Sequence, residues 1–432
     1  MSASANGSTG GLPATADVVV IGAGAVGLCT SLALREAGRD VIVLDRAVPG
    51  TGASGRNAGV MSVAGVVPTA TPGVIRSVPH MLLDPLSPLA IRWTYLPRLA
   101  PWLLRFVLAS RPSRVESISS TLGTLVGPAM EAWERFLPDG PAALASGGGL
   151  LYAYRTEASF DRDALALELR RRRGIGLEIL DDAGIGSLDP QLAGRFHRGI
   201  LIPASRYTPD PAAFTAALAE RLTAAGGTVA RADVRDLVAE DGVTSEVRTS
   251  AGAIRATNVV VAAGAWSGPL ARQVGAPVPL DTERGYGVEL PRPGISLRTP
   301  ILSGDYHFAL TPALDGGLRL AGTDELAGIG AAPNFRRAEK LVAAAQTVFP
   351  ELDAGGASQW IGFRPSMPDS LPVIGRAPRA PNVVLAFGHG HVGLTLAAIT
   401  ARLVAEILEG RPTSVDISPF RPERFRRLRG RG

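Results

Sequence analysis

The sequence is poor in several residue types on which common classes of protein depend. Among its 432 residues there is one cysteine, Cys29, which excludes a disulfide framework and a metal site built from thiolates. There is one lysine, Lys340, so the formal net charge of +5 comes almost entirely from arginine. Aromatic residues make up 5% of the chain and do not alternate with basic residues as they do on surfaces that stack nucleic acid bases. We therefore expect no nucleic acid partner.

Signals for secretion and for membrane insertion are also missing. Residues 1–16 are rich in Ser, Gly and Ala and lack both a basic start and an apolar stretch, which predicts a disordered tail. No apolar run approaches the ~20 residues that a spanning helix needs. The basic residues 425–432 predict a second tail. These features predict a cytoplasmic protein, and the length suits about two domains.

The chain opens on a pattern typical of dinucleotide binding. Residues 17–21 form a largely β-branched run, as expected of a strand that is buried on both faces. The motif Gly22-Ala23-Gly24-Ala25-Val26-Gly27 follows directly and begins a predicted helix. A second strand, residues 41–44, leads to Asp45. This order of strand, glycine turn, helix, strand and acid is the known context of the dinucleotide motif.

Each residue of that pattern has a physical role. Gly22 permits the tight turn, Gly24 lets a pyrophosphate approach the backbone, and Gly27 lets the helix pack closely on the strand. The helix start supplies free N–H groups and partial positive charge for phosphate. Asp45 can accept hydrogen bonds from ribose hydroxyls.

Two later turns favour a flavin over a nicotinamide cofactor. Residues 259–266, Val-Val-Val-Ala-Ala-Gly-Ala-Trp, predict a buried strand that ends in a turn of small residues. Residues 387–395, Phe-Gly-His-Gly-His-Val-Gly-Leu-Thr, predict a strand-to-helix turn whose N–H groups could meet the edge of a flat ring. The helix that begins near Val392 would direct its positive end at the flavin C2 carbonyl. A nicotinamide enzyme has no evident need for this turn.

Two histidines in the second turn, His389 and His391, invite a metal interpretation. No third histidine or carboxylate accompanies them at the spacing of a metal site, so we expect no metal. We expect both to hydrogen-bond the flavin or a neighbouring carbonyl. Covalent attachment of the flavin through a histidine is an open alternative.

Several motifs together resemble the D-amino acid oxidase (DAO) superfamily of FAD-dependent oxidoreductases. The resemblance runs from about residue 17 to about residue 424 and rests on Gly22–Gly27, Asp45-Arg46, Ala53-Ser54, Asn57-Ala58-Gly59 and Arg284-Gly285-Tyr286. A narrower resemblance is to the small-subunit type of bacterial D-amino acid dehydrogenase. It rests on Trp360-Ile361-Gly362-Phe363-Arg364-Pro365-Ser366-Met367-Pro368-Asp369, Pro372-Val373-Ile374-Gly375 and Gly388-His389-Gly390.

The resemblance implies a mixed fold of two domains, both discontinuous in sequence. A Rossmann-like α/β domain that binds FAD would comprise residues 17–79, 195–270 and 356–424. An α+β substrate domain, with an antiparallel sheet and a helical insertion, would comprise residues 80–194 and 271–355. Substrate would meet one face of the flavin ring beneath that sheet.

The predicted FAD contacts combine the motif residues with neighbours on the nucleotide side and at the ring. They are Gly22, Gly24, Ala25, Val26, Gly27, Asp45, Arg46, Ser54, Asn57, Ala58, Gly59, Val234, Ala263, Gly264, Trp266, Gly362, Gly390, His391, Val392, Gly393, Leu394 and Thr395.

The predicted catalytic residues are Arg364, Tyr286, Tyr306 and His389. In the superfamily the arginine of a Gly-x-Arg-Pro motif binds the substrate carboxylate, and here that arginine is Arg364. A guanidinium can hold a carboxylate through two parallel hydrogen bonds and so aim Cα at the flavin. The alternative is a structural ion pair with an acid such as Asp369. Each tyrosine could instead fill the surface of the sheet.

This chain also departs from its relatives at two places. Arg284-Gly285-Tyr286 replaces the Lys-Gly-Tyr of some relatives, and His391 stands where relatives often have a smaller polar residue. Both places could change substrate size or flavin contacts.

The implied reaction is oxidative deamination of a small D-amino acid, with hydride passing from Cα to flavin N5 and the imine hydrolysing to a 2-oxo acid and ammonia. Electrons would pass to a quinone or another carrier, or to oxygen. The alternatives are D-proline, a hydroxy-D-proline or an N-methyl amino acid as substrate, a non-catalytic or electron-transfer flavin subunit of a complex, and an NAD-binding module without flavin.

One further segment, residues 89–108, mixes Trp, Tyr and Phe with aliphatic residues and arginines. Such a mixture can lie at a membrane interface, which would suit an enzyme that reaches a quinone on the inner face of the cytoplasmic membrane. The alternative is that its helices pack on the body of the protein, and the prolines favour this because they break a long amphipathic face.

Overall fold

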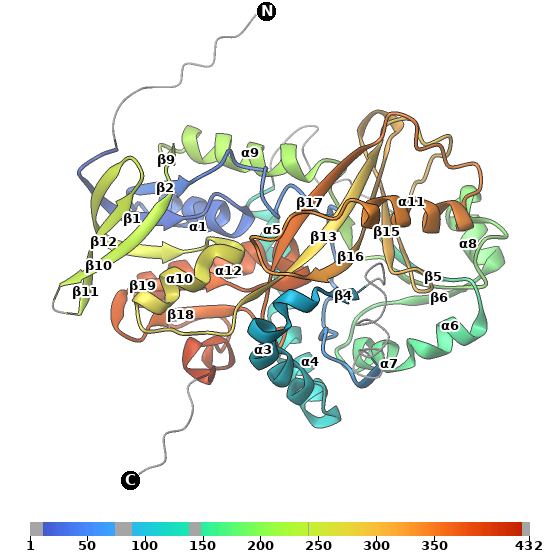
Figure 1. Ribbon diagram of the computed structural model, residues 1–432, viewed down its shortest axis with the longest axis horizontal. Coiled ribbons are helices and arrows are strands. Elements are labelled where there is room, and N and C mark those ends of the chain that lie inside the picture. The colour runs from blue at the N-terminus through green and yellow to red at the C-terminus, as the bar shows by residue number, and fades with distance from the viewer. Residues whose placement is uncertain (1–11, 74–88, 138–147, 241, 426–432) are drawn as a thin grey trace, which may run out of the picture.

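The chain folds around two large β-sheets, one at each side of the molecule in Figure 1. The structure, a computed structural model, describes residues 12–73, 89–137, 148–240 and 242–425. Within these ranges one sheet has eight strands, the other has nine, and a third, small sheet pairs β3 (Val60–Met61) with β8 (Arg206–Tyr207).

The first sheet has a parallel centre. Five parallel strands run in the order β9-β2-β1-β12-β19, β18 lies antiparallel beside β19, and the hairpin β10-β11 pairs with the start of β12. The strands are β1 (Thr15–Ile21), β2 (Val41–Asp45), β9 (Thr228–Arg231), β10 (Val234–Glu240), β11 (Val243–Thr249), β12 (Gly252–Val261), β18 (Val373–Ala377) and β19 (Ala380–Phe387).

Helices cover both faces of this sheet. On one face lie α1 (Ala25–Glu36), α9 (Pro211–Ala224) and α12 (Gly393–Leu408), and on the other lies α10 (Ser267–Gln273). Successive residues of β1 therefore enter two different cores, Val18 and Val20 on the first face and Val19 on the second. This explains why the strand reads as a continuous apolar run and not as an alternation.

The second sheet is mainly antiparallel, in the order β17-β13-β16-β15-β14-β5-β7-β6, with β4 beside β16. Helix α11 (Arg336–Val348) packs on one face of it. The strands are β4 (Leu89–Ile91), β5 (Leu150–Tyr154), β6 (Glu178–Asp181), β7 (Arg198–Ile202), β13 (Asp281–Leu290), β14 (Ile301–Ser303), β15 (Phe308–Pro312), β16 (Leu318–Leu326) and β17 (Ser358–Ser366).

Further α-helices of the described ranges lie in the stretch predicted as a helical insertion. They are α3 (Leu96–Ala109), α4 (Pro112–Val126), α5 (Ala129–Glu134), α6 (Glu157–Arg162), α7 (Ala164–Arg172) and α8 (Asp182–Leu188). Pro112 begins α4 and Pro97 lies in the first turn of α3, where a missing backbone N–H costs no helical hydrogen bond, whereas Pro101 lies inside α3. The predicted mixed fold, with an α/β part and an antiparallel-sheet part that are both discontinuous, is confirmed.

The predicted domain boundaries need correction at three places. Strands β7 and β17 lie in the second sheet, although they fall in ranges 195–270 and 356–424 that we assigned to the dinucleotide domain. Helices α4 and α5, which fall in the range 80–194 assigned to the substrate domain, pack into the same core as α1 and α12. Periodicity in a sequence predicts that a strand or helix forms but contains no information on its partner in space, which is why these boundaries were wrong.

The predicted tails fall partly outside the described residues. Of residues 1–16, the first eleven lie outside, whereas Thr15 and Ala16 already belong to β1. Of residues 425–432, only Phe425 is described, and it ends a short 3-10 turn.

One helical segment, Gly390–Leu408, is long and apolar enough to cross a membrane by length and composition. This corrects the prediction that no apolar run approaches that length. About two thirds of this stretch (67%) is buried inside the protein, where α12 packs on α1. A core helix passes the same test, so the finding is a weak indication of a membrane span.

A buried ion cluster joins β13, β16 and the segment after β4. Arg284 has no exposed surface, and its Nη1 lies 3.3 Å from Oε2 of Glu325. Nη2 of Arg92 lies 3.3 Å from the other oxygen of Glu325, and the Tyr286 hydroxyl donates to Oε2 at 2.7 Å. Glu325 therefore balances a guanidinium that water does not reach.

We predict that Glu325→Ala lowers the free energy of unfolding by about 3–5 kcal/mol, because it leaves the charge of Arg284 buried without its counter-ion. Urea titration followed by circular dichroism measures the change. The control is Glu168→Ala, which removes an exposed ion pair with Arg172 and should cost at most about 1 kcal/mol. Equal losses in the two variants would contradict this reading of the cluster.

Candidate functional site

The turn between β1 and α1 has no room for side chains at two of its glycines. Gly22 has a φ of +112°, and a Cβ there would lie 2.4 Å from the carbonyl oxygen of Ala262, just beyond β12. A Cβ on Gly27 would lie 1.9 Å from the carbonyl oxygen of Gly22. The turn is therefore pressed against the carboxyl end of the sheet, as the motif requires.

The start of α1 has the properties of an anion site. The N-cap residue is Gly24, which has no side chain that could cap the helix. The first N–H groups of any α-helix lack partners within the helix. The Ala25 N–H donates to Ser54 Oγ at 2.9 Å, so Ser54 brings a hydroxyl to the helix end. A Cβ at Gly24 would lie 3.0 Å from that same oxygen. Backbone N–H groups, a hydroxyl and a partial positive charge thus meet at one point, which suits a phosphate.

Asp45, at the end of β2, is held beside this turn. Its Oδ2 accepts from the Ala23 N–H at 2.7 Å and its Oδ1 accepts from the Ala47 N–H at 2.9 Å. The carboxylate is half-buried, and each oxygen has a further lone pair. Asp45 is thus fixed in place with acceptor capacity left for a ribose hydroxyl.

Loop 53–59 connects the anion site with the second sheet. The Asn57 amide donates to the Ala53 and Ser54 carbonyl oxygens at 2.9 and 2.6 Å, and the Gly59 N–H donates to Asn57 Oδ1 at 2.7 Å. From β16, Arg319 donates to the Asn57 carbonyl oxygen at 3.1 Å. The Asn57 side chain thus fixes the conformation of the loop, and Ala58 lies between Asn57 and Gly59, which are both held by these hydrogen bonds.

A stack of side chains joins the end of β2 to the second sheet. The guanidinium of Arg46 lies 3.7 Å from the ring centre of Trp266, and Trp266 meets Phe363 of β17 edge to face, with ring centres 5.4 Å apart. Trp266 belongs to a 3-10 turn, Gly264–Trp266, which Ala263 precedes. Val234 lies at the start of β10 and is half-buried against the core of the first sheet.

The turn before α12 brings its histidines to different places. His389 is buried, and its Nε2 lies 3.0 Å from Thr400 Oγ1 inside α12. Burial lowers the pKa of His389 to about 4, so it stays neutral at physiological pH. This placement argues against the predicted catalytic role for His389 and makes it a support for the turn.

Residues after this turn serve the packing of α12. Thr395 Oγ1 accepts from the Ser62 N–H at 3.1 Å, and the Trp133 indole N–H donates to the carbonyl oxygens of Leu394 and Thr395 at 3.0 and 3.1 Å. Val392 packs so closely on Gly65 that a Cβ there would lie 2.6 Å from Val392 Cγ1. Gly390, Val392 and Gly393 thus form a helix start that is held from several sides.

Arg364 lies flat on the second sheet. A Cβ on Gly285, in the neighbouring strand β13, would lie 2.6 Å from the guanidinium carbon of Arg364, so only glycine fits beneath it. Nη1 of Arg364 donates to the Thr323 carbonyl oxygen at 3.2 Å and pairs with Asp324. The predicted alternative was a structural ion pair with an acid such as Asp369. Asp369 is not the partner, because it pairs with Arg424 at 2.9 Å, but Arg364 does form an ion pair with another acid, Asp324.

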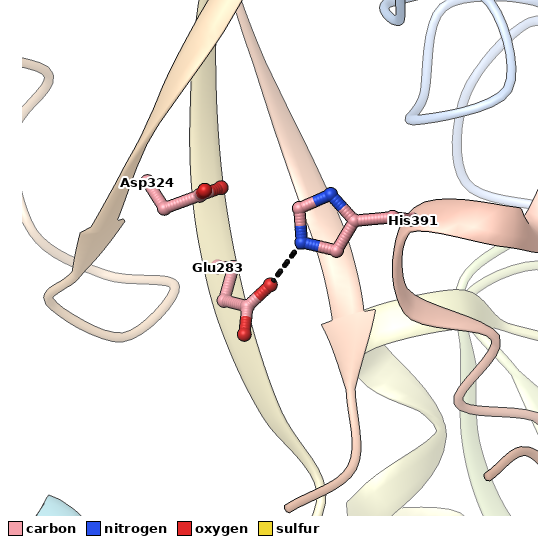
Figure 2. Close-up of side chains that lie close together, drawn as sticks. All are labelled: Glu283, Asp324 and His391. Carbon is pink, nitrogen blue, oxygen red and sulfur yellow. Dashed lines mark hydrogen bonds and ion pairs between the residues drawn. The ribbon is translucent and has the colours of Figure 1, made fainter. Parts of the chain in front are cut away.

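His391 lies in the turn before α12, and its side chain reaches the same face of the second sheet as Arg364 (Figure 2). Its Nε2 lies 2.7 Å from Oε2 of Glu283, which is directly opposite Arg364 in the pairing of β13 with β17. Ligand atoms of Glu283, Asp324 and His391 all lie within 4.8 Å of one another. The fold therefore gathers Arg364, His391, Glu283 and Asp324 into one group, which we call the charged cluster.

The charges in the cluster act on one another. Burial would raise the pKa of Glu283, but the hydrogen bond from His391 and the positive charges of His391 and Arg364 lower it overall. Partial burial would lower the pKa of His391, but the carboxylates of Asp324 and Glu283 outweigh this and raise it. Glu283 therefore stays ionised, and His391 holds a proton more strongly than an ordinary histidine.

Two carboxylates beside a histidine are also a possible metal-ligand set, which spacing in the sequence did not reveal. Here, however, Arg364 pairs with Asp324, and His391 bonds to Glu283. A metal ion would have to displace a guanidinium that already provides the positive charge. We therefore assign no metal to the charged cluster.

Neither predicted tyrosine shares this face. Side chains alternate along a strand, so Tyr286 lies on the other face of the sheet from Gly285 and Arg364. There it is buried near α11, and its hydroxyl donates to Glu325. Tyr306 lies in the turn between β14 and β15, where its hydroxyl accepts from Arg155 at 2.9 Å. In the described part of the chain no hydrogen bond or ring contact joins either tyrosine to Arg364. Their positions favour the alternative that they fill the sheet.

Two members of the charged cluster, Glu283 and Asp324, were missed by the sequence analysis. Glu283 directly precedes the Arg284-Gly285-Tyr286 motif, so strand alternation could have placed it on the face of Gly285. Asp324 had no comparable signal. It lies forty residues from Arg364 in the chain, and a register shift in the pairing of β13 with β16 decides which face its side chain takes.

The sequence as a whole matches one family. The model of the family described as FAD dependent oxidoreductase (DAO) matches residues 17–407, nearly the whole chain. The chain belongs to the DAO family of FAD-dependent oxidoreductases.

Curated relatives agree with this membership, and a solved structure shares the fold. A D-amino-acid oxidase of Bradyrhizobium diazoefficiens is 39% identical over 423 residues, which cover 96% of this chain and 100% of the relative. A D-amino acid dehydrogenase of Paramagnetospirillum magneticum is 34% identical, covering 94% and 98%. A glycine oxidase structure from Geobacillus kaustophilus shares the fold, with a TM-score of 0.71 at 22% identity over 95% of this chain and 98% of that one.

The residues present fit FAD, the cofactor of the DAO family. The α1 start with Ser54 suits the pyrophosphate, and Asp45 suits the adenosine ribose. The helix start at Gly393 suits a ring edge that gains negative charge on reduction.

We predict that Asp45→Ala weakens FAD binding by about 1–3 kcal/mol, or roughly 5- to 150-fold in Kd, because a fixed acceptor is lost. Flavin absorbance after extensive dialysis measures retention. The control is Asp40→Ala at the other end of β2, where the side chain is 76% exposed. Full flavin occupancy in the Asp45 variant would contradict the assignment.

Proposed function

We propose that the protein oxidises the Cα–N bond of a small D-amino acid and yields a 2-oxo acid and ammonia. The observation that carries this proposal is the placement of Arg364 on the sheet face that meets His391 and loop 53–59. Similarity to proteins named D-amino-acid oxidase and D-amino acid dehydrogenase supports it.

Arg364 is arranged to hold a carboxylate. The Thr323 carbonyl oxygen and Asp324 fix one side of the guanidinium through Nη1, and Gly285 lies beneath it. In the described part of the chain Nη2 and Nε make no hydrogen bond, so they can form two parallel bonds with a carboxylate. Such a pair sets both the position and the angle of Cα.

The protein has little covalent chemistry of its own to perform. FAD, when bound, supplies the acceptor for the hydride that leaves Cα. The chain's residues bind the carboxylate, orient Cα and set the charge around the substrate nitrogen. The imine leaves the site or meets water there, and hydrolysis gives the 2-oxo acid. We propose a quinone or another carrier as the next electron acceptor, with oxygen as the alternative.

An anaerobic panel tests this function. Purified protein with bound flavin is mixed with D-amino acids, their L enantiomers, D-proline, hydroxy-D-proline and N-methyl amino acids, and bleaching of the flavin band is followed. We expect bleaching by at least one small D-amino acid. Bleaching only by cyclic or N-methyl substrates would replace the proposed substrate class. No bleaching by any of them would favour an electron-transfer subunit.

We predict that Arg364→Ala retains FAD but loses kcat/KM for flavin reduction by about 10²-fold or more, since a charge-assisted bidentate pair disappears. Anaerobic stopped-flow reduction measures this. Arg248→Ala, which removes an exposed arginine from β11, is the control and should behave like the native protein. Equal efficiency in the Arg364 variant would exclude its role.

We also propose that the protein works in the cytoplasm and touches an anionic membrane surface through α3. Within the segment 89–108, Trp102 and Phe106 stack in the core, which favours the packing alternative for those two residues. The opposite face of α3 still exposes Leu104 at 62%, Val107 at 42% and Leu108 at 41%. Apolar side chains beside arginines suit an interface of lipid headgroups.

We predict that the protein floats with anionic liposomes at low salt and that Leu104→Glu reduces the floating fraction, because it adds a negative charge to that face. The control is Leu165→Glu on α7, which is 45% exposed and lies on another helix. Protein that stays at the bottom of the gradient would leave α3 as an ordinary surface helix.

A further inference from the structure

The proposed reaction needs a proton acceptor, and the arginine that would bind the substrate carboxylate cannot serve as one. An amino acid arrives with its nitrogen protonated at neutral pH, and an ammonium group has no lone pair to form the imine bond. Arg364 is a permanent cation and cannot take this proton. Asp324 is occupied by Arg364. The acceptor must therefore be sought among the remaining members of the charged cluster.

His391 has the geometry of such an acceptor. Its Nε2 faces Glu283 Oε2 at 2.7 Å, and Figure 2 shows its other ring nitrogen, Nδ1, on the side away from Glu283. In the described part of the chain Nδ1 has no hydrogen-bond partner. The side chain is 41% exposed, so a ligand can reach it, whereas Glu283 is 6% exposed.

The bond to Glu283 decides which tautomer His391 adopts. An ionised carboxylate only accepts hydrogen bonds, so neutral His391 must carry its hydrogen on Nε2 and donate it to Glu283. The lone pair then lies on Nδ1. The same carboxylate stabilises the imidazolium that forms when Nδ1 takes a proton. A carboxylate behind a histidine performs these two tasks in other enzymes that use histidine as a general base.

We propose that His391 removes a proton from the ammonium group of the bound amino acid, and that Glu283 is its positioning residue. This rests on the proposed function, because it concerns the same site and substrate. The N–H bond of the ammonium group breaks, its electron pair stays on nitrogen, and the proton forms a bond with Nδ1. The products are a neutral amine and an imidazolium. The neutral amine would then have the lone pair that the imine bond needs when Cα gives up its hydride to bound FAD.

The groups around His391 set the pH range of this step. Glu283 faces it from β13, Asp324 from β16 and Arg364 from β17. The two carboxylates raise the pKa of His391 despite the opposing effects of partial burial and Arg364. His391 is therefore a stronger base than an ordinary histidine and is neutral only above its raised pKa. Flavin reduction should rise with pH as His391 loses its proton.

The structure also offers a matched control. His197, on the surface between α8 and β7, lies 2.7 Å from Glu157 through the same pair of atoms, Nε2 and Oε2. Its side chain is 51% exposed and belongs to no part of the candidate site. Any general effect of losing a histidine–glutamate pair should appear in His197→Gln as well.

The test follows anaerobic flavin reduction between about pH 6 and pH 10, with the D-amino acid that bleaches the native protein best. We expect His391→Gln to lose about 10²-fold in kcat/KM at neutral pH and to recover toward high pH, where the substrate amine loses its proton to water. Glu283→Gln should shift the rising limb of the profile to lower pH, because the histidine becomes a weaker base. His197→Gln should match the native profile.

A second measurement needs no turnover. The chain has five histidines, so histidine-selective NMR can assign His391 by its disappearance in His391→Gln. We expect its pKa to fall in Glu283→Gln and to stay unchanged in His197→Gln. A native pH profile in His391→Gln, with FAD retained, would overturn the proposal. So would a uniform loss at all pH values, because that indicates a structural role. A native protein that no amino acid reduces would instead refute the proposed function.

Discussion

The site depends on how closely the second sheet approaches the turns of the first domain. At Gly362 of β17 a Cβ would lie 2.5 Å from the Arg56 carbonyl oxygen, and at Gly285 it would meet the Arg364 guanidinium. Only a sheet surface with glycine at these points can carry a charged side chain flat against it and meet loop 53–59. The close approach explains why strands far apart in the chain share glycines on one face.

Charge balance is the second constraint on the interface between the domains. Arg284 and Glu325 compensate each other on the α11 side of the sheet, and Arg364, Asp324, Glu283 and His391 do so on the opposite side. A buried or half-buried charge is costly unless a partner of opposite sign is near. In the charged cluster, Nδ1 of His391 and the Nη2 and Nε atoms of Arg364 make no hydrogen bond within the described part of the chain, which leaves them available to a ligand.

The two histidines of one turn illustrate how environment divides similar residues. His389 and His391 are two positions apart, yet one is buried against Thr400 with a depressed pKa and the other bonds to Glu283 with a raised pKa. The first remains neutral and supports the turn, and the second holds its proton more strongly than an ordinary histidine. A difference of this kind arises from the partners that each side chain meets.

The sequence alone determined the dinucleotide-binding unit, because its signals are local. The strand, the Gly22–Gly27 turn, the helix and Asp45 follow one another between Thr15 and Asp45, and each acts on its immediate neighbours. It also determined the family, and through a motif it predicted a role for Arg364. What only the tertiary structure decided is which strands share a sheet and which side chains meet across it. These features depend on contacts between residues far apart in the chain, and strand periodicity contains no information on such partners. They include the sheet to which β7 and β17 belong, the partner of Arg364, the burial of Tyr286 and the contact of His391 with Glu283.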